Sequence, residues 1–249
     1  MPSEQTAYLW VERTPPEFIF DVKAFRLFTT HPTSYDVLPK SIRERVAPPK
    51  KNLYYKDLPA EMVDEMWSMY RHALQPLHQV GKLGVVLLQF PKWFVPSPQN
   101  KDHILRCKEQ LPDFRVAVEF RSASWLSEDD AERTALLLEE NNLAYVCVDE
   151  PQGFASSVPP VALVTSDVAL VRFHGRNTGA WEASTRTSGE RFDYWYQKAD
   201  FQEWVPKIGE LEEKAREVHL LMNTNRVNQA PVNAAQLRMV LSEAGVALA

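Results

Sequence analysis

A short run near residue 170 joins a buried strand to side chains that can bind an anion or move a proton. Residues 168–176 read VALVRFHGR, so an apolar run ends in Arg172, His174 and Arg176. Arginine binds phosphate or carboxylate through two parallel hydrogen bonds, and histidine titrates near neutral pH. Side chains alternate along a strand, so Arg172 and His174 share one face while Phe173 takes the other. This predicts a polar site at the carboxyl end of a strand, where parallel α/β proteins bind ligands.

The same run also has a structural interpretation. An arginine at a strand end can pair with a structural carboxylate, and a histidine there can simply cap the strand. Both interpretations stay open on these residues alone. The other strands must show whether polar groups converge on the same place.

Five further apolar runs end in polar side chains in the same way. They cover residues 18–23, 83–90, 115–121, 144–149 and 218–223. In each run one parity becomes polar near the carboxyl end, and the opposite parity is almost wholly apolar. The polar parity gives Asp21, Lys23, Gln89, Glu119, Arg121, Asp149, Arg172, His174 and Asn223, with Asn225 just beyond.

The order of these runs predicts the fold class. Strands that alternate with helical segments predict a parallel sheet with right-handed crossovers. A doubly wound sheet has helices on both faces, which gives it no reason to turn one face polar. A barrel has an inside, and its inward side chains at the carboxyl mouth form the site. We therefore predict an α/β fold, a TIM-type (β/α) barrel of parallel strands, as a single domain over residues 1–249.

Six of the eight strands of a TIM-type barrel are recognisable, so the barrel is expected to be incomplete and truncated on its N-terminal side. The missing pair belongs between residues 218–223 and residues 18–23, which leaves an open edge on each of these strands. Inner residues such as Ile19, Val85 and Leu221 should then be less covered than in a complete barrel. Exposed strand edges template association, so we expect self-association through these edges.

One long segment breaks the alternation. Residues 25–58 show no clear period and contain the basic residues Arg43, Arg45, Lys50 and Lys51. A loop of this length inside a compact domain is usually functional or partly disordered. We expect the same of this segment.

Composition excludes several classes of protein. Of the 249 residues, 45% are hydrophobic and 24% are charged, the mix of a globular domain. The net charge of -5 provides no global basic field for nucleic acid or an anionic membrane, although a local basic pocket is compatible with it. The two cysteines, Cys107 and Cys147, argue against a disulfide scaffold and favour a reducing cytoplasm. No apolar run approaches the roughly 18–20 residues of a membrane span, and residues 1–5 lack the features of a signal peptide, so we expect a cytoplasmic protein.

Four motifs follow one another along the chain. They are TPPEFIFDVK at 14–23, KLGVVLLQFP at 82–91, VEFR at 118–121 followed by Ser124 and Trp125, and VRFHGR at 171–176. In this order they resemble the motifs of the DUF72 (YecE-like) family, and the resemblance covers nearly the whole chain. Members of this family are TIM-type barrels whose activity is not established. The resemblance therefore implies the same fold and no particular reaction.

The chain departs from the family pattern in two places. Family members begin with two further strands, including one that reads roughly Val-Glu-Ile-Asn-Ser-Thr-Phe-Tyr, and this sequence starts after it. The Phe-Asn-Asn of the family's last strand corresponds to Met-Asn-Thr-Asn at 222–225, so the second amide is displaced or supplied by Asn225. The missing strands would have contributed residues to the mouth.

The polar residues suggest roles in chemistry on an anionic substrate. We expect His174, Glu119 and Asp149 to be catalytic, with His174 and Glu119 close enough to act on one substrate. Glu119 and Asp149 could instead orient neighbouring cations. No cofactor and no metal site is expected, because the neighbouring arginines disfavour a metal cation. Binding of the substrate is assigned to Lys23, Gln89, Arg121, Trp125, Arg172, Arg176, Asn223 and Asn225.

Two functions from different classes follow. The first is a hydrolase- or lyase-type enzyme that uses acid–base chemistry on a small anionic molecule, phosphorylated or nucleotide-like. The second is a non-catalytic module that binds an anion or nucleic acid, or an inactive fragment. Binding needs only the arginines, whereas catalysis also needs an acid and a base within reach of one reacting atom. Nucleic acid is compatible with the local cations but is not indicated by the net charge, and no membrane partner is expected.

Overall fold

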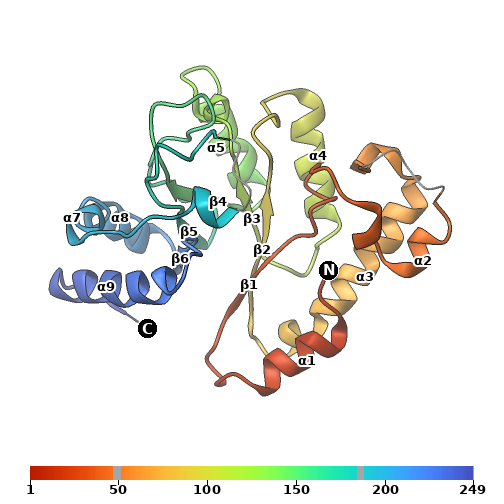
Figure 1. Cartoon of the computed structure of the whole chain (residues 1–249), viewed down its shortest axis with the longest axis horizontal. Coiled ribbons are helices and arrows are strands. Elements are labelled where there is room, and N and C mark those ends of the chain that lie inside the picture. The colour runs from red at the N-terminus through yellow and green to blue at the C-terminus, as the bar shows by residue number, and fades with distance from the viewer. Residues whose placement is uncertain (47–51, 184–187, 249) are drawn as a thin grey trace. The chain divides into compact units, whose positions relative to one another are not determined.

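The computed structural model describes residues 1–46, 52–183 and 188–248 (Figure 1). Lys50 and Lys51 of the basic loop therefore lie outside the described residues. The chain divides into two compact units, Met1–Glu119 and Phe120–Ala249. Each unit is built on three parallel strands, and each is described separately below.

The sheet of the first unit brings three polar residues to one edge. Its strands are β1 (Phe20–Lys23), β2 (Leu83–Gln89) and β3 (Val116–Glu119), paired in that order. Gln89 lies opposite Glu119 at the carboxyl end of the ladder, and Lys23 ends the neighbouring strand opposite Leu87. Side chains directly opposite one another in a sheet share a face. Lys23, Gln89 and Glu119 therefore lie on one face, as their parity predicts.

The first two strands do not keep one register. Phe20 pairs with Leu83, whereas Val22 pairs with Val86, so β2 contains one extra residue between these pairs. Such a bulge leaves a backbone amide without a strand partner. The Oδ1 atom of Asp21 accepts a hydrogen bond from the Val85 amide over 3.0 Å. The Asp21 carboxylate therefore supports the bulge.

Helices and short turns surround this sheet. They are α1 (Glu4–Glu12), η1 (Tyr35–Val37), α2 (Lys40–Arg43), η2 (Tyr55–Asp57), α3 (Ala60–Gln79) and α4 (Pro98–Glu109). The described part of the long segment after β1 thus contains η1, α2 and η2. Helix α3 buries Val63, Met66 and Tyr70 at helical spacing, and α1 packs against it (Figure 1). The buried ammonium of Lys82 holds the end of α1 by donating to the carbonyl oxygens of Val11 and Thr14, at 3.0 and 2.9 Å.

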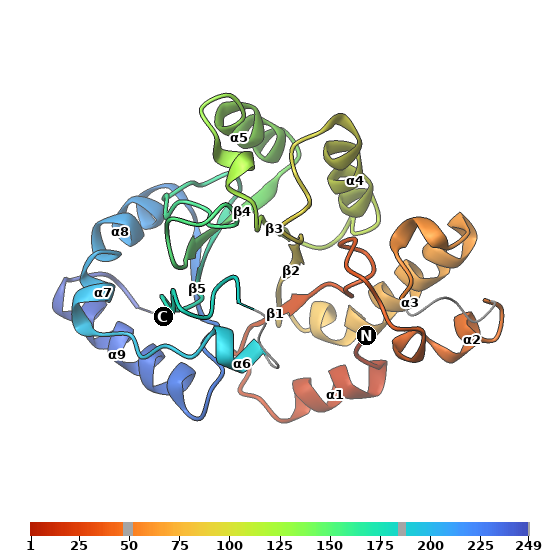
Figure 2. The ribbon, with the colours of Figure 1, turned by 45° about the horizontal axis from the view of Figure 1, so that its top comes forward.

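The sheet of the second unit consists of β4 (Leu143–Asp149), β5 (Val168–Phe173) and β6 (Glu217–Met222). Strands β4 and β5 are buried along their whole length, whereas every residue of β6 is half-buried. Helices α8 and α9 contact β6, and α7 lies against both helices (Figure 2). The helical elements of this unit are η3 (Ala123–Leu126), α5 (Ala131–Glu140), α6 (Ser188–Arg191), α7 (Lys198–Gln202), α8 (Val205–Lys214) and α9 (Gln229–Glu243).

The predicted fold class is confirmed. The described residues form an α/β fold with six parallel strands, consistent with an incomplete TIM-type barrel. The expectation that Val85 is poorly covered is wrong, because its side chain is fully buried; Ile19 is exposed and Leu221 is half-buried. Within the described part of the chain, no helix combines the length and apolar character needed to cross a membrane.

Candidate functional site

The first unit contributes a cation and an amide at the ends of adjacent strands. The Lys23 ammonium donates to Oε1 of Gln89 over 3.1 Å. Glu119, opposite Gln89 in the ladder, is completely buried. Burial of a carboxylate requires partners or a local positive charge. Lys23, Gln89 and Glu119 therefore form a polar group of side chains at the carboxyl ends of the strands.

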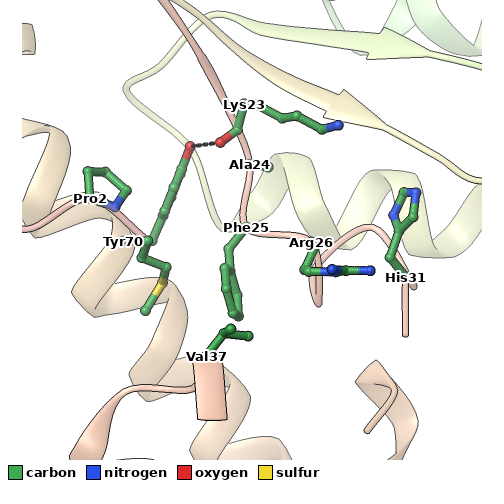
Figure 3. A pocket seen from close by; sticks show the side chains of 9 residues that line it. Pro2, Lys23, Ala24, Phe25, Arg26, His31, Val37 and Tyr70 are labelled. Atoms are coloured by element: carbon green, nitrogen blue, oxygen red, sulfur yellow. Dashed lines mark hydrogen bonds between the residues drawn. The ribbon is translucent and has the colours of Figure 1, made fainter. Parts of the chain in front are cut away.

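A cavity of about 590 Å³ opens beside Lys23 (Figure 3). In Figure 3 the side chains of Lys23 and Arg26 extend toward the side on which His31 lies, and Tyr70 donates to the Lys23 carbonyl oxygen over 3.2 Å. Among the described lining residues, three side chains can carry positive charge and none is a carboxylate. An anion would meet cations there without a competing acid. The lining residues are Met1, Pro2, Lys23, Ala24, Phe25, Arg26, His31, Val37 and Tyr70.

In the second unit, hydrogen bonds join Arg172, Asn223 and His174 in a row. Nη2 of Arg172 donates to Oδ1 of Asn223 over 2.6 Å. Nδ2 of Asn223 lies 2.9 Å from Nδ1 of His174. Arg172 and His174 follow one parity of β5, and Asn223 directly follows β6, opposite that end of the strand. The predicted grouping of these three residues is therefore present in the structure.

This row of hydrogen bonds selects one protonation state of His174. A guanidinium has only donors, so it must face the amide oxygen of Asn223. The amide nitrogen of Asn223 then faces His174, and because that nitrogen only donates, Nδ1 must accept. The proton of the neutral imidazole is consequently carried by Nε2. In this tautomer the lone pair of His174 is at Nδ1, where Asn223 donates to it, and Nε2 is a donor.

A second arginine of this unit pairs with an acid that the parity argument missed. Nη1 of Arg121 lies 3.1 Å from Oε2 of Glu150, whose side chain is fully buried. The other carboxylate oxygen of Glu150 accepts the Val158 amide over 2.7 Å. The guanidinium of Arg121 also stacks over Trp181, 4.7 Å from the ring centroid, in a cation–π contact. The positive charge of Arg121 is therefore shared between a carboxylate and an aromatic face.

Aromatic rings link Arg121 to His174. The Phe192 ring lies 5.6 Å from the imidazole of His174 and 6.4 Å from the ring of Trp181. His174 is completely buried, so Phe192 forms part of its cover. Arg121, Trp181, Phe192, His174 and Asn223 consequently belong to one continuous set of contacts.

The parity prediction is wrong for Asp149. The register of β4 and β5 places Val148 opposite Arg172 and Asp149 opposite Phe173. Phe173 packs against Tyr196, Phe201 and Trp204, so Asp149 faces these residues and not the side of Arg172. The acid that follows the face of Arg172 is the next residue along the chain, Glu150.

Asp149 instead organises a buried cluster, here called the Asp149 cluster. Its carboxylate accepts hydrogen bonds from the Tyr196 hydroxyl at 2.7 Å, from the Trp204 indole at 2.6 Å and from Arg176 at 2.7 Å. Burial, with the Asp149 charge next, raises the pKa of Tyr196 well above its usual value, so the hydroxyl stays a donor. Asp149 is therefore committed to holding the segment after β5.

Arg176 also belongs to the Asp149 cluster and not beside Arg172. Gly175 adopts a φ of +85°, and a Cβ there would lie 2.7 Å from Cβ of Tyr194, so the turn requires glycine. The turn directs Arg176 to three carboxylates: Asp149, Asp200 and Glu203. Hydrogen bonding to Asp149 is the main reason that the pKa of Arg176 is raised. These three carboxylates compensate the positive charge of Arg176, which does not support its predicted role in substrate binding.

The remaining predicted residues occupy less central positions. Trp125 in η3 is fully buried and stacks on Phe120 with ring centroids 4.2 Å apart, so its ring packs in the core. Asn225 is exposed beyond β6, and Asn223 makes the amide contacts described above. Glu119 belongs to the first unit and His174 to the second, and their convergence on one substrate stays a prediction. Within the described ranges, no group of three or more His, Cys, Asp or Glu residues could hold a metal ion.

Comparison with known proteins gives consistent results. The family model described as "Protein of unknown function DUF72" matches residues 1–248. The UPF0759 protein YunF of Bacillus subtilis (strain 168) is 30% identical over 236 residues, which are 93% of this chain and 76% of that protein. The crystal structure of a DUF72 family protein from Enterococcus faecalis V583 superimposes with a TM-score of 0.80 at 24% identity, covering 97% of this chain and 80% of that one. One from Thermotoga maritima MSB8 gives a TM-score of 0.74 at 28% identity, with the same coverage.

Proposed function

The chain belongs to the DUF72 family of proteins of unknown function, and on this premise we propose that it is an enzyme acting on a small anionic, phosphorylated substrate. The reaction class is hydrolysis or elimination, in which negative charge develops on an oxygen as a bond breaks. The observation that carries the proposal is the row Arg172–Asn223–His174 at the carboxyl ends of β5 and β6. Ligands bind at this end of the strands in parallel α/β folds.

His174 is the residue that would meet the developing charge. Because Asn223 donates to Nδ1, Nε2 carries the proton and can donate a hydrogen bond to a substrate oxygen. A neutral imidazole acts in this way as an electrophile and needs no change of charge during the reaction. A general base must then come from another residue. Removing one donor that stabilises an oxyanion typically lowers kcat by about 10²–10³.

The preference for an anion rests on the cations of each unit taken separately. In the second unit, Arg172 is 8% exposed and Arg121 is held between Glu150 and Trp181. In the first unit, the cavity beside Lys23 has Arg26 and His31 in its lining and no carboxylate among the described lining residues. Positive side chains held in place by their neighbours bind phosphate well, because little side-chain freedom is lost on binding.

One observation favours a non-catalytic binding module instead. The two acids at the end of β4 are both engaged by arginines, Asp149 by Arg176 and Glu150 by Arg121. Acids used in this way fix cations in place and are poorly suited to move protons. A module that only holds an anion would need this arrangement and nothing more.

Two variants of His174 separate these functions. The wild-type chain is incubated with a panel of sugar phosphates and nucleotides, and product formation is followed by mass spectrometry together with phosphate release. His174→Gln retains an N–H donor in place of Nε2 and should keep measurable turnover, whereas His174→Leu should lose about 10²–10³-fold in kcat. Equal loss in both variants contradicts a donor role.

Binding is measured in parallel by calorimetry with pyrophosphate at low and high salt. Anion binding without any turnover indicates the binding module. Absence of both binding and turnover in the folded wild-type chain overturns the proposal.

A further inference from the structure

The first unit contains a second cavity, of about 670 Å³, outside the site described above. Four segments build it: Thr30 in the segment after β1, residues 54–56 in and before η2, the loop after β2 with Trp93 and Phe94, and one face of α4. This volume is typical of pockets for small organic ligands, which are concave and mostly apolar with a few placed polar groups. The cavity is named the α4 cavity below.

Aromatic rings form the walls of the α4 cavity. Tyr54, Tyr55, Trp93 and Phe94 all line it. Phe94 is held rigidly, since it stacks on Phe90 with ring centroids 4.1 Å apart, whereas Trp93 is 54% exposed at the rim. An exposed indole next to fixed rings provides a surface on which a planar ring, such as a nucleic-acid base, can stack.

His103, one of the lining residues, has one ring nitrogen that can accept a hydrogen bond. Its Nε2 lies 2.8 Å from the Phe28 carbonyl oxygen, which can only accept, so Nε2 carries the proton and Nδ1 is the acceptor. Burial, with Arg106 nearby, lowers the pKa of His103, which keeps the ring neutral at pH 7. Tyr55 contacts the ring edge-on at 4.7 Å and holds its orientation. An N–H donor on the ring of a ligand is the chemical complement of this acceptor.

The charged residues of the α4 cavity are Lys56 and Arg106, and no carboxylate is found among its described lining residues. Both side chains are exposed, so they can reach an anionic group at the entrance. Asn100 also lines the cavity; its Nδ2 donates to the Val95 carbonyl oxygen over 2.8 Å, and its amide oxygen is an acceptor. The cavity lining therefore contains two kinds of polar group: hydrogen-bond acceptors that suit the ring of a ligand, and cations that suit its negatively charged group.

We infer that the α4 cavity binds a nucleoside monophosphate. The base would stack on Trp93 with its amino group toward His103, and the phosphate would pair with Arg106 and Lys56. A planar ring with an N–H donor and an anionic group is the one chemistry that uses all three features. The inference is independent of the proposed function, because it involves no residue of that site.

The test uses AMP, adenosine and inorganic phosphate as probes, titrated against the whole chain by calorimetry and by tryptophan fluorescence. AMP should bind more tightly than adenosine, and phosphate should bind weakly at this cavity. Trp93→Ala and Arg106→Gln should each raise the Kd of AMP by about 10-fold or more, whereas Arg106→Gln should leave adenosine binding unchanged. Matched controls are Trp195→Ala and Arg133→Gln, which remove an exposed tryptophan and an exposed arginine of the second unit.

One further variant identifies where AMP binds. His31 lines the cavity beside Lys23, and its ring lies 6.2 Å from that of Trp93, so the phosphate of AMP has an alternative location nearby. Lys23→Ala should leave AMP affinity unchanged if the α4 cavity is the site. If AMP does not bind at low salt, or if Lys23→Ala abolishes binding that Trp93→Ala leaves intact, the inference is overturned. Trp93→Phe, which keeps a ring, should retain binding and confirms that the Trp93 variants fold.

Discussion

Nη2 of Arg172 donates to Oδ1 of Asn223 over 2.6 Å, and this hydrogen bond determines which end of the Asn223 amide faces His174. An amide can otherwise rotate to offer either oxygen or nitrogen to a neighbour. The arginine removes that choice, since a guanidinium cannot accept. Arg172 of β5 therefore sets the tautomer of His174, which directly follows β5, through Asn223, which directly follows β6. Arg172 is a positioning residue in this sense, whether or not it also contacts a ligand.

The tautomer of His174 can be measured directly. We expect nitrogen chemical shifts of the imidazole to show a proton on Nε2 in the wild-type chain. In Arg172→Met the Asn223 amide can turn its oxygen toward His174, so a population with the proton on Nδ1 should appear. His103 serves as an internal control, because the Phe28 carbonyl oxygen fixes its tautomer independently of Arg172. A wild-type His174 with its proton on Nδ1 would disprove the proposed arrangement.

The Asp149 cluster should dominate the stability of the second unit. Asp149→Asn removes the charge that faces Arg176 and puts an amide nitrogen, a donor, among groups that already donate. Breaking a buried ion pair from one side typically costs about 3–5 kcal/mol. We expect a loss of that order in the free energy of unfolding, measured by urea denaturation.

Glu203→Gln is the matched control for this prediction. Glu203 contacts the same guanidinium of Arg176 at 2.9 Å, but its side chain is 59% exposed. Exposed ion pairs contribute at most about 1 kcal/mol. Equal losses of unfolding free energy in the two variants would show that burial does not determine how much each carboxylate contributes to stability.

The sequence does not show on which face of the sheet the Asp149 side chain lies. Alternation along a strand gives two faces but does not say which face of one strand continues that of the next. A polar residue at the end of a strand indicates the inner face, but at β4 two acids, Asp149 and Glu150, follow one another at the strand end. Only the register, which pairs Val148 with Arg172, shows that Glu150 is the acid on that face. A charged pair at a strand end is thus ambiguous by one residue.

Where the polar residues at a strand end follow one parity, the register agrees with the face that the sequence predicts. Gln89 and Glu119 lie opposite one another, and Arg172, His174 and Asn223 form one hydrogen-bonded row. The cavity residues Arg26 and His31 escaped prediction because they lie in a segment without periodicity. A chain path that leaves no repeating pattern can be obtained only from the folded structure.

The cavity beside Lys23 should bind a small anion in a salt-dependent way. Arg26→Ala removes one of its three potentially cationic side chains without touching the sheet, so we expect the Kd of pyrophosphate to rise by about 10-fold at low salt. The difference should shrink as salt screens the charges. Arg13→Ala, an exposed arginine of the same unit that does not line the cavity, should leave binding unchanged. Calorimetry at two salt concentrations provides the measurement, and an unchanged Kd in Arg26→Ala would exclude this anion site.

Cys147 should make the chain less stable as the pH rises above about 9. Burial raises the pKa of its thiol from 9.0 to about 12. Between these values the unfolded chain loses the thiol proton while the folded chain keeps it, so the unfolded state is favoured increasingly with pH. The slope for one proton is about 1.4 kcal/mol per pH unit. Below pH 9 both states hold the proton, and the contribution of Cys147 is fully present.

The comparison of Cys147→Ala with the wild type isolates this contribution, because Cys107, whose pKa burial also raises, is present in both. At pH 8 the variant should be less stable, since it loses a buried sulfur atom. Between pH 9 and pH 11 the difference in unfolding free energy should narrow, because only the wild type has to keep the Cys147 thiol protonated. Val146→Ala, at a neighbouring buried position without a titrating group, should differ from the wild type by a constant amount over the same range. A constant difference for Cys147→Ala as well would mean that the folded chain ionises this thiol as readily as the unfolded one.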